Sequence, residues 1–194
     1  MSLAGIILAA GQSRRMGMPK ALLSYEGETL LDRWIRLMAE HCFPVLVVVG
    51  HHRDQICAGS QRASQATFVV NDAPERGQFS SLKCALVELP EGCAGFMFTP
   101  VDYPSVQPAT VAKLAHAFNN THAPVVAPRF RGRSGHPVCC ARALAAEMLA
   151  EPDESQARII IRRYGDRLHY VEVEDPGILM DVDDPEAYTR LLSQ

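Results

Sequence analysis

The sequence predicts an α/β domain built on a mainly parallel β-sheet. Short apolar runs alternate with helix-like patterns over the first two thirds of the 194 residues, which is typical of strand–helix–strand units. The runs are apolar throughout, as in strands that helices cover on both faces. The length fits one medium-sized domain and no repeat or linker interrupts it, so we expect a single domain over residues 1–194.

The predicted helices rest on apolar residues at helical spacing and on residues that commonly begin helices. Leu30, Leu31, Trp34, Leu37 and Met38 recur at helical intervals, which predicts a helix over 30–41. The other predicted helices begin at Ser80 or Ser81, at Pro108, at 142, at 156 and at Pro185. The predicted strands cover 5–10, 44–49, 66–70, 95–99, 123–127 and 168–173. We expect the last helix to bury Tyr188, Leu191 and Leu192.

Composition excludes several classes of protein. The net charge of −3 argues against a general nucleic-acid binder, and no apolar run approaches the roughly 18 residues that span a membrane. The apolar start has no basic segment before it and leads into a charged loop, so we interpret it as a strand and not as a signal peptide. The six cysteines form no CxxC pair, and we interpret them as reduced thiols of a cytoplasmic protein.

Residues 8–20 read LAAGQSRRMGMPK, a glycine-rich and basic loop directly after the first strand. Gly11 and Gly17 allow close approach of the backbone to a ligand, while Arg15 and Lys20 are suited to hold phosphate oxygens. The loop lacks both the Lys–Ser/Thr pair of a P-loop and the G-x-G-x-x-G dinucleotide fingerprint. The residue types alone leave two interpretations, an anion-binding loop or a surface loop with solvated arginines.

The complete pattern L-A-A-G-x-S-x-R-M-G-x-x-K resembles the signature of the molybdenum cofactor nucleotidyltransferases, within the nucleotide-sugar-transferase-like superfamily. Its fixed positions are Leu8, Ala9, Ala10, Gly11, Ser13, Arg15, Met16, Gly17 and Lys20. The resemblance implies a Rossmann-like, three-layer α/β/α domain whose loop wraps a nucleoside triphosphate. Arg15 and Lys20 would then neutralise the phosphates during catalysis, whereas Arg14 occupies a variable position and is expected to face solvent. Members that begin LAAG tend to use CTP and those that begin LAGG tend to use GTP, so Ala10 favours CTP.

A second matching segment is NDAPERGQFSSL, residues 71–82. It is similar to the family's G-x-x-S-S-L turn, and this resemblance implies that Ser80 and Ser81 contact the base or the ribose. Asn71, at a predicted strand end, is expected to reach the base edge. Helix capping by a single serine is the alternative that the residues leave open.

Two acidic segments resemble the family's metal-binding elements. Asp102 ends an apolar strand where the family usually reads D-Q-P, with Tyr103 in place of glutamine, and MDVDDPE at 180–186 resembles D-[IV]-D-x-P-E-[DE]. The resemblance implies that Asp102 and Asp183 hold Mg²⁺, with Asp181 as the other candidate for the second ligand. Asp181 and Asp183 are expected to point the same way in an extended segment. Capping by Asp184, within a solvated acidic turn, is the alternative.

The segment RFRGRSGHPVCC, residues 129–140, contains a G-H-P-V element similar to one that the family often carries. The resemblance implies that Gly135, His136 and Pro137 help to bind the acceptor, with Arg131 or Arg133 available for its phosphate. A lone histidine is usually structural, but both a structural and a ligand-binding role stay open for His136. His51 and His52 are interpreted as a surface turn.

The matched motifs together predict a Mg²⁺-dependent nucleotidyltransferase. The leading substrates are CTP and a molybdopterin-type cofactor, whose phosphate would attack the nucleotide and release pyrophosphate, and a molybdoenzyme is an expected transient partner. One alternative keeps this chemistry with a sugar or polyol phosphate as the acceptor. The other is a ligand-binding or accessory relative of the fold that transfers no nucleotide.

Overall fold

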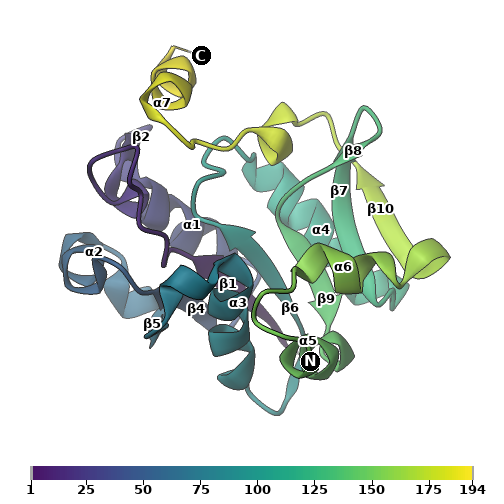
Figure 1. The fold of residues 1–194 in the computed structure, drawn as a ribbon. Helices are drawn as coiled ribbons and strands as arrows, with labels where there is room; N and C mark the ends of the chain where they lie inside the picture. Colours follow the sequence, from purple (N-terminus) through teal and green to yellow (C-terminus); the bar gives the residue numbers. More distant parts are fainter. Residues whose placement is uncertain (1, 194) are drawn as a thin grey trace.

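The computed structural model describes residues 2–193, which form one eight-stranded sheet with helices on both faces (Figure 1). The strands lie in the order β10-β7-β9-β6-β1-β4-β5, and β8 pairs with β7. β9 runs antiparallel to both of its neighbours, β6 and β7. The pairs β1–β4, β1–β6, β4–β5 and β7–β10 are all parallel. The prediction of a mainly parallel α/β fold is therefore confirmed.

The bounds of the elements differ from the predicted ones mostly at their ends. The main-sheet strands are β1 Ser2–Leu8, β4 Val45–Val49, β5 Thr67–Val70, β6 Cys93–Pro100, β7 Val125–Phe130, β8 Arg133–Ser134, β9 Val138–Ala141 and β10 Leu168–Glu172, with a separate hairpin of β2 Ser24–Tyr25 and β3 Glu28–Thr29. The helices are α1 Leu30–Ala39, α2 Arg53–Gly59, α3 Gln78–Val87, α4 Pro108–Thr121, α5 Ala143–Ala150, α6 Ala157–Arg162 and α7 Pro185–Leu192. Short 3-10 turns lie at Lys20–Leu22, Ala63–Gln65, Pro74–Arg76, Gly165–Arg167 and Pro176–Leu179.

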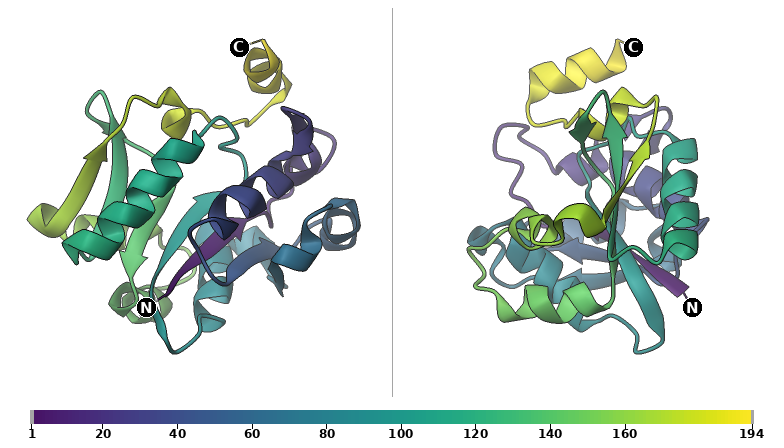
Figure 2. Two further views of the ribbon diagram at one scale, coloured as in Figure 1. Left: turned by 180° about the vertical axis from the view of Figure 1, so that it is seen from behind. Right: turned by 90° about the vertical axis from the view of Figure 1, so that its right-hand side faces the viewer.

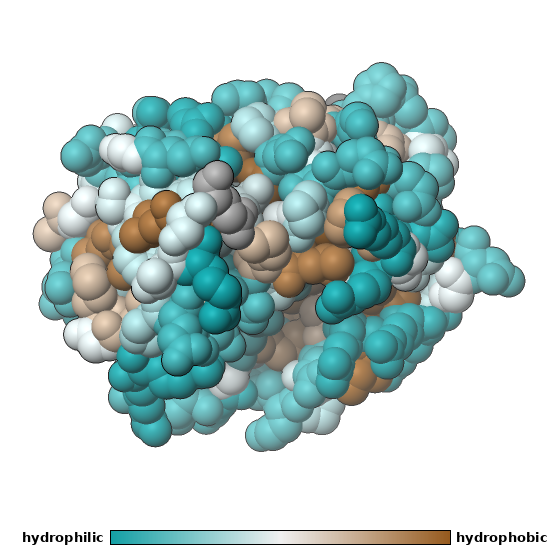
Figure 3. All heavy atoms as spheres, turned by 90° about the horizontal axis from the view of Figure 1, so that it is seen from above, coloured by the Kyte–Doolittle hydropathy of each residue, from teal (hydrophilic) through white to brown (hydrophobic). Residues whose placement is uncertain are grey.

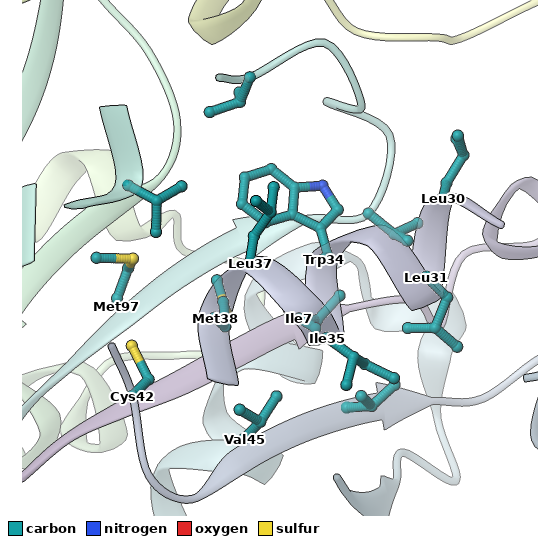
Figure 4. Close-up of a cluster of buried hydrophobic side chains, with 14 of the residues drawn as sticks. Ile7, Leu30, Leu31, Trp34, Ile35, Leu37, Met38, Cys42, Val45 and Met97 are labelled. Atoms are coloured by element: carbon teal, nitrogen blue, oxygen red, sulfur yellow. The ribbon is translucent and has the colours of Figure 1, made fainter. Parts of the chain in front are cut away.

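Helices lie against both faces of the sheet (Figure 2). A separate layer of apolar side chains packs them against each face. α1 and α4 cover one face, where Trp34 of α1 is almost fully buried with Ile7 of β1 and Met97 of β6 (Figure 4). α3, α5 and α6 cover the other face against Ile6 and Phe96. Residues that alternate along β1 and β6 thus enter different layers, which explains why these strands read as continuous apolar runs.

Several expectations about individual elements are wrong. Helix α3 begins at Gln78, so Ser80 and Ser81 lie inside its first turn and do not cap it. Leu192 on α7 is 57% exposed, whereas Leu191 is buried, because the short helix turns only one edge to the core. The sequence did not predict α2, β8 or β9, since each is short and β9 lies where the motif suggested a loop. Capping by Asp184, the alternative stated for the acidic turn, does occur, since Asp184 caps α7 by accepting from the amide of Ala187 at 2.8 Å.

Two further properties bear on the class of protein. All six cysteines lie within the described residues and are free thiols. Within residues 2–193, no helix combines the length and the apolar character that a membrane span requires.

Candidate active site

The segments that the motifs singled out converge at one edge of the sheet. β1, β4, β5 and β6 are parallel, so their carboxyl ends meet at the same edge, which is the usual place for ligand sites in such sheets. The glycine-rich loop, residues 9–19, leaves the end of β1, and Asp102 follows the end of β6. Seen from above this edge, the surface is hollowed, with hydrophobic atoms between hydrophilic rims (Figure 3).

The glycine-rich loop is folded so that it presents Lys20. Ser13 has a left-handed backbone with φ of 50°, and its hydroxyl oxygen accepts a hydrogen bond from the amide of Lys20 at 3.0 Å. Gly17 has φ of 68°, a conformation that side chains disfavour. A Cβ on Gly11 would meet no atom within 4 Å, so this position faces open space. Arg14 is exposed and bonds to Gln12 in the same loop, as expected for a variable position.

Lys20 lies between the two carboxylates, Asp102 and Asp183. Its ammonium donates to Asp102 Oδ2 at 3.0 Å and to Asp183 Oδ1 at 2.5 Å. The side chains of Lys20 and Asp102 are 15% and 20% exposed, so this ion pair is largely shielded from water. Burial opposes the charged form of Lys20, but the two carboxylates outweigh it and raise the lysine pKa. The lysine lowers the pKa of Asp183.

The surrounding charges leave this site negative. Asp181 and Asp184 flank Asp183 in sequence, and Arg15 pairs with Asp183 at 3.0 Å and with Asp184 at 3.8 Å. Four carboxylates against the two cations Arg15 and Lys20 leave two uncompensated negative charges. Burial raises the pKa of Asp102, with Lys20 opposing the shift and Asp181 and Asp183 adding to it.

A divalent cation suits this donor set. In residues 2–193, no three His, Cys, Asp or Glu side chains form a ready metal cage. Asp102 and Asp183 offer only oxygen atoms, so a bound cation would complete its shell with water and substrate phosphates. Mg²⁺ characteristically binds in this way, through one or two carboxylates.

A small cavity of about 230 Å³ adjoins this carboxylate pair. It brings together most of the predicted nucleotide-binding residues, namely Leu8, Ala9, Ala10, Gly11, Ser13, Lys20 and Ser81, together with Asp102. Arg15 and Gly17 do not line it, and Arg15 instead contacts the acidic segment 183–184 from the solvent side, with 63% of its side chain exposed.

Asn71 and Ser80 are not part of the lining of this cavity. Both are buried, and the Asn71 amide donates to the hydroxyls of Ser80 and Ser81 at 3.0 Å each. Ser80 in turn donates to the carbonyl of Gly77 at 2.8 Å. Their hydrogen bonds brace the start of α3 against the end of β5, and nucleotide contact by Asn71 or Ser80 stays a prediction.

A second, larger cleft of about 900 Å³ shares Leu8, Gly77 and Gln78 with the small cavity. Gly135, His136, Arg133 and Asp181 line it, so the G-H-P-V segment and one of the two candidate arginines reach this cleft. Pro137 is buried outside the lining. Arg131 points away to stack on Phe130, 5.0 Å from the ring centre.

Tyr103 and His136 form an aromatic wall of the large cleft. Their ring centres are 5.0 Å apart, and the rings of Phe98 and His136 form a T-shaped pair with their centres 5.7 Å apart. Burial lowers the pKa of His136 to about 4, so the imidazole is neutral near pH 7. Burial and the nearby carboxylates raise the pKa of Tyr103 to about 12, which keeps its hydroxyl protonated.

Comparison with known proteins assigns the chain to a family. The model of the MobA-like NTP transferase domain matches residues 5–168. The chain belongs to this family. That match includes the glycine-rich loop, the α3 turn, Asp102 and the G-H-P-V element, whereas Asp181 and Asp183 lie beyond its end.

The relatives of this NTP transferase include enzymes with different nucleotides in their names. It is 28% identical over 185 residues to the molybdenum cofactor cytidylyltransferase of Escherichia coli, covering 94% of this chain and 92% of that protein. It is 34% identical over 130 residues to a probable molybdenum cofactor guanylyltransferase of Rhodopirellula baltica, covering 64% and 59% of the two chains.

Solved structures share the fold over the whole chain. Rv0371c from Mycobacterium tuberculosis superposes with a TM-score of 0.86 and 25% identity, over 100% of this chain and 98% of that one. A structure of that protein in complex with manganese superposes with a TM-score of 0.82 at 22% identity, over 100% of both chains. These matches confirm the predicted nucleotide-diphospho-sugar transferase-like fold.

Sequence reasoning did not single out three basic residues of the large cleft. Arg76, Arg158 and Arg162 line it together with Arg133. Arg158 and Arg162 are four residues apart on α6, so the exposed face of the predicted helix over 156–164 contained the signal. Arg76 pairs with Asp153 at 3.0 Å, but among the described residues Arg133, Arg158 and Arg162 make no ion pair within 4.0 Å.

Proposed function

We propose that this NTP transferase moves a cytidylyl group from CTP to the phosphate of a molybdopterin-type cofactor, with release of pyrophosphate. The observation that carries the proposal is the position of Lys20, held between Asp102 and Asp183 beside a cavity that the glycine-rich loop lines. A carboxylate pair suited to a divalent cation, next to a cavity that Lys20 and the glycine-rich loop line, fits the binding of a triphosphate. The cytoplasm is the proposed location, in line with the six free thiols.

The protein's own groups would act by positioning and by charge. Lys20 and Arg15 would meet the negative charge of the triphosphate, and the amides of the glycine-rich loop would hydrogen-bond its oxygens. Asp102 and Asp183 would hold Mg²⁺, which supplies charge neutralisation at the reacting phosphorus and at the departing pyrophosphate. The acceptor phosphate would attack directly, so no protein nucleophile is required.

The large cleft is the proposed acceptor site. It shares Leu8, Gly77 and Gln78 with the small cavity, so an acceptor bound there would lie next to the nucleotide. The aromatic pair Tyr103 and His136 suits the flat ring system of a pterin. Arg133, Arg158 and Arg162, which have no ion-pair partner among residues 2–193, suit an anionic acceptor. A molybdoenzyme that receives the product is the proposed transient partner.

CTP is the proposed nucleotide because Ala10 matches the LAAG form of the signature. Ala10 is 3% exposed and lines the small cavity, where a methyl group reduces the room for a base. The names of the relatives include both cytidylyl- and guanylyltransferases, so the choice of CTP rests on Ala10 and not on these names.

A nucleotide-by-acceptor screen tests the proposed function. Pyrophosphate release would be measured with each of the four NTPs, with Mg²⁺, and with molybdopterin cofactor, a sugar phosphate or a polyol phosphate as acceptor. Release that needs CTP, Mg²⁺ and the molybdopterin cofactor together is the expected result. Release with a sugar or polyol phosphate would replace the acceptor, and no release under any combination would reject nucleotidyl transfer.

A further inference from the structure

A buried carboxylate outside the proposed catalytic set links the two chain segments that carry Asp102 and Asp183. Asp175 is 1% exposed and takes part in no ion pair within residues 2–193. Its Oδ2 accepts from the amide of Gln107 at 2.9 Å and from the hydroxyl of Thr110 at 2.6 Å. Its Oδ1 accepts from the amide of Gly177 at 2.9 Å. All of its described partners are therefore uncharged donors.

These donors belong to two different elements. Gln107 precedes α4 and has no side-chain cap of its own, so Asp175 supplies the missing acceptor at that helix start. Gly177 lies in the 3-10 turn Pro176–Leu179, which Asp175 caps directly. We call residues 102–107 the Asp102 loop and residues 174–183 the strap. One carboxylate thus accepts hydrogen bonds both from the start of α4, where the Asp102 loop ends, and from the first turn of the strap. Negative charge at helix starts is favourable, which explains how the buried group is tolerated.

The strap packs closely against the Asp102 loop. A Cβ on Gly177 would lie 2.3 Å from the carbonyl oxygen of Ser105, so the strap runs directly against the Asp102 loop. Further along, the amide of Val182 donates to the carbonyl of Asp102 at 2.8 Å. On the other side of the loop, Arg33 donates to the carbonyls of Pro104 at 2.6 Å and Val106 at 3.2 Å. The Asp102 loop is held between Arg33 and the strap.

We infer that Asp175 is a positioning residue, which fixes Asp183 beside Asp102 by anchoring the strap to the start of α4. The inference rests on the proposed function in one respect, the use of this carboxylate pair to bind a metal–nucleotide complex. An asparagine at 175 keeps one acceptor oxygen, and whichever way its amide turns, either Gly177 or the pair Gln107 and Thr110 loses its acceptor. The strap would then detach from α4, and Asp183 would lose its fixed place relative to Asp102.

The test compares Asp175→Asn with Asp32→Asn. Asp32 is also a buried aspartate, 3% exposed, and accepts from Ser60, Gln61 and Arg62 in a part of the fold that does not carry the carboxylate pair. Two quantities would be measured on both variants. One is the rate of hydrogen exchange in peptides covering 102–107 and 176–183, and the other is the affinity for Mn²⁺–CTP, measured by calorimetry. We expect faster exchange of both peptides and about tenfold or greater weakening of binding only in Asp175→Asn.

Each outcome decides the inference. Equal exchange and equal binding in the two variants would overturn it, since a general loss of stability would then explain both. If the wild-type protein binds neither Mn²⁺–CTP nor Mn²⁺–GTP, the proposed function fails and hydrogen exchange alone decides the role of Asp175. If Asp175→Asn does not fold, Thr110→Val takes its place, because it removes one donor and leaves the carboxylate. It is expected to speed exchange of the same peptides.

Discussion

The amide of Val182 donates a hydrogen bond of 2.8 Å to the carbonyl of Asp102, joining the strap to the end of β6. Val182 is 2% exposed, so its side chain is in the core while its two acidic neighbours remain outside. Asp183 reaches Lys20 and Arg15, whereas Asp181 is exposed and lines the large cleft. The two carboxylates therefore have different contacts, although both lie close enough to Asp102 and Tyr103 to raise the pKa of each.

This division predicts different defects for Asp183→Asn and Asp181→Asn. Loss of the Asp183 charge removes one of the two proposed cation ligands, so kcat/KM for the nucleotide is expected to fall at least about a hundredfold. Asp181→Asn is expected to change mainly the KM for the acceptor, because that residue lines the large cleft. Steady-state kinetics with each substrate varied in turn would separate the two effects. Equal nucleotide defects in both variants would contradict the assignment of Asp183.

Asp102→Ala is expected to abolish turnover and leave the fold intact. Burial raises the pKa of this carboxyl, so its removal relieves a desolvation penalty, and Lys20 keeps its ion pair with Asp183, so no unpaired charge is left behind. Thermal unfolding would check the fold and pyrophosphate release the activity. Glu186→Gln is the matched control, because that side chain is 89% exposed. Rates near wild type in Asp102→Ala would remove this residue from the metal site.

Lys20→Met is expected to separate nucleotide binding from metal binding. In the described structure the lysine neutralises Asp102 and Asp183, so a free divalent cation must compete with it for the same oxygens. Without the ammonium, Mn²⁺ binding in the absence of nucleotide is expected to become tighter, while turnover falls about a hundredfold or more. Lys113→Met, at an exposed position on α4, is the control. Weaker Mn²⁺ binding in Lys20→Met would show that the lysine does not occupy the cation's place.

His136 gives the protein a pH dependence of stability that can be isolated. Its folded-state pKa of about 4 lies below the ordinary value of 6.5, so between these values the unfolded chain binds a proton that the folded chain does not. Stability from this group is therefore complete above pH 6.5 and is lost as the pH falls toward 4. His136→Gln is expected to lose less stability than wild type across that window. Urea unfolding at several pH values would measure the difference, with exposed His169→Gln as the control. Parallel stability curves for wild type and His136→Gln would contradict the expectation.

The fold could be predicted from local apolar patterns in the sequence, and the loop that lines the small cavity from its resemblance to a family signature. Continuous apolar strands indicate a covered parallel sheet, and the glycine-rich loop carries its residues within one segment. The brace from Asn71 to Ser80 and Ser81 was not readable, since serines that cap a helix and serines that pack inside its first turn have the same spacing signal. Asp175 was also missed, because its partners Gln107 and Thr110 come from another element.

Ala10→Gly tests the proposed preference for CTP. Ala10 is buried, lines the small cavity, and is the position at which the LAAG and LAGG forms of the signature differ. Removing its methyl group would enlarge the proposed nucleotide cavity, and one methyl-sized change in a binding pocket corresponds to a roughly tenfold or greater change in selectivity. The ratio of kcat/KM for CTP to that for GTP is therefore expected to fall about tenfold.

Ala9→Gly is the matched control, because Ala9 lines the same cavity and is common to both forms of the signature. Added backbone freedom in the loop would affect both variants, since glycine replaces alanine in each. A fall in the CTP-to-GTP ratio confined to Ala10→Gly would therefore assign base discrimination to the Ala10 methyl group. An equal fall in both variants would assign it to loop rigidity, and an unchanged ratio in Ala10→Gly would remove the basis for preferring CTP.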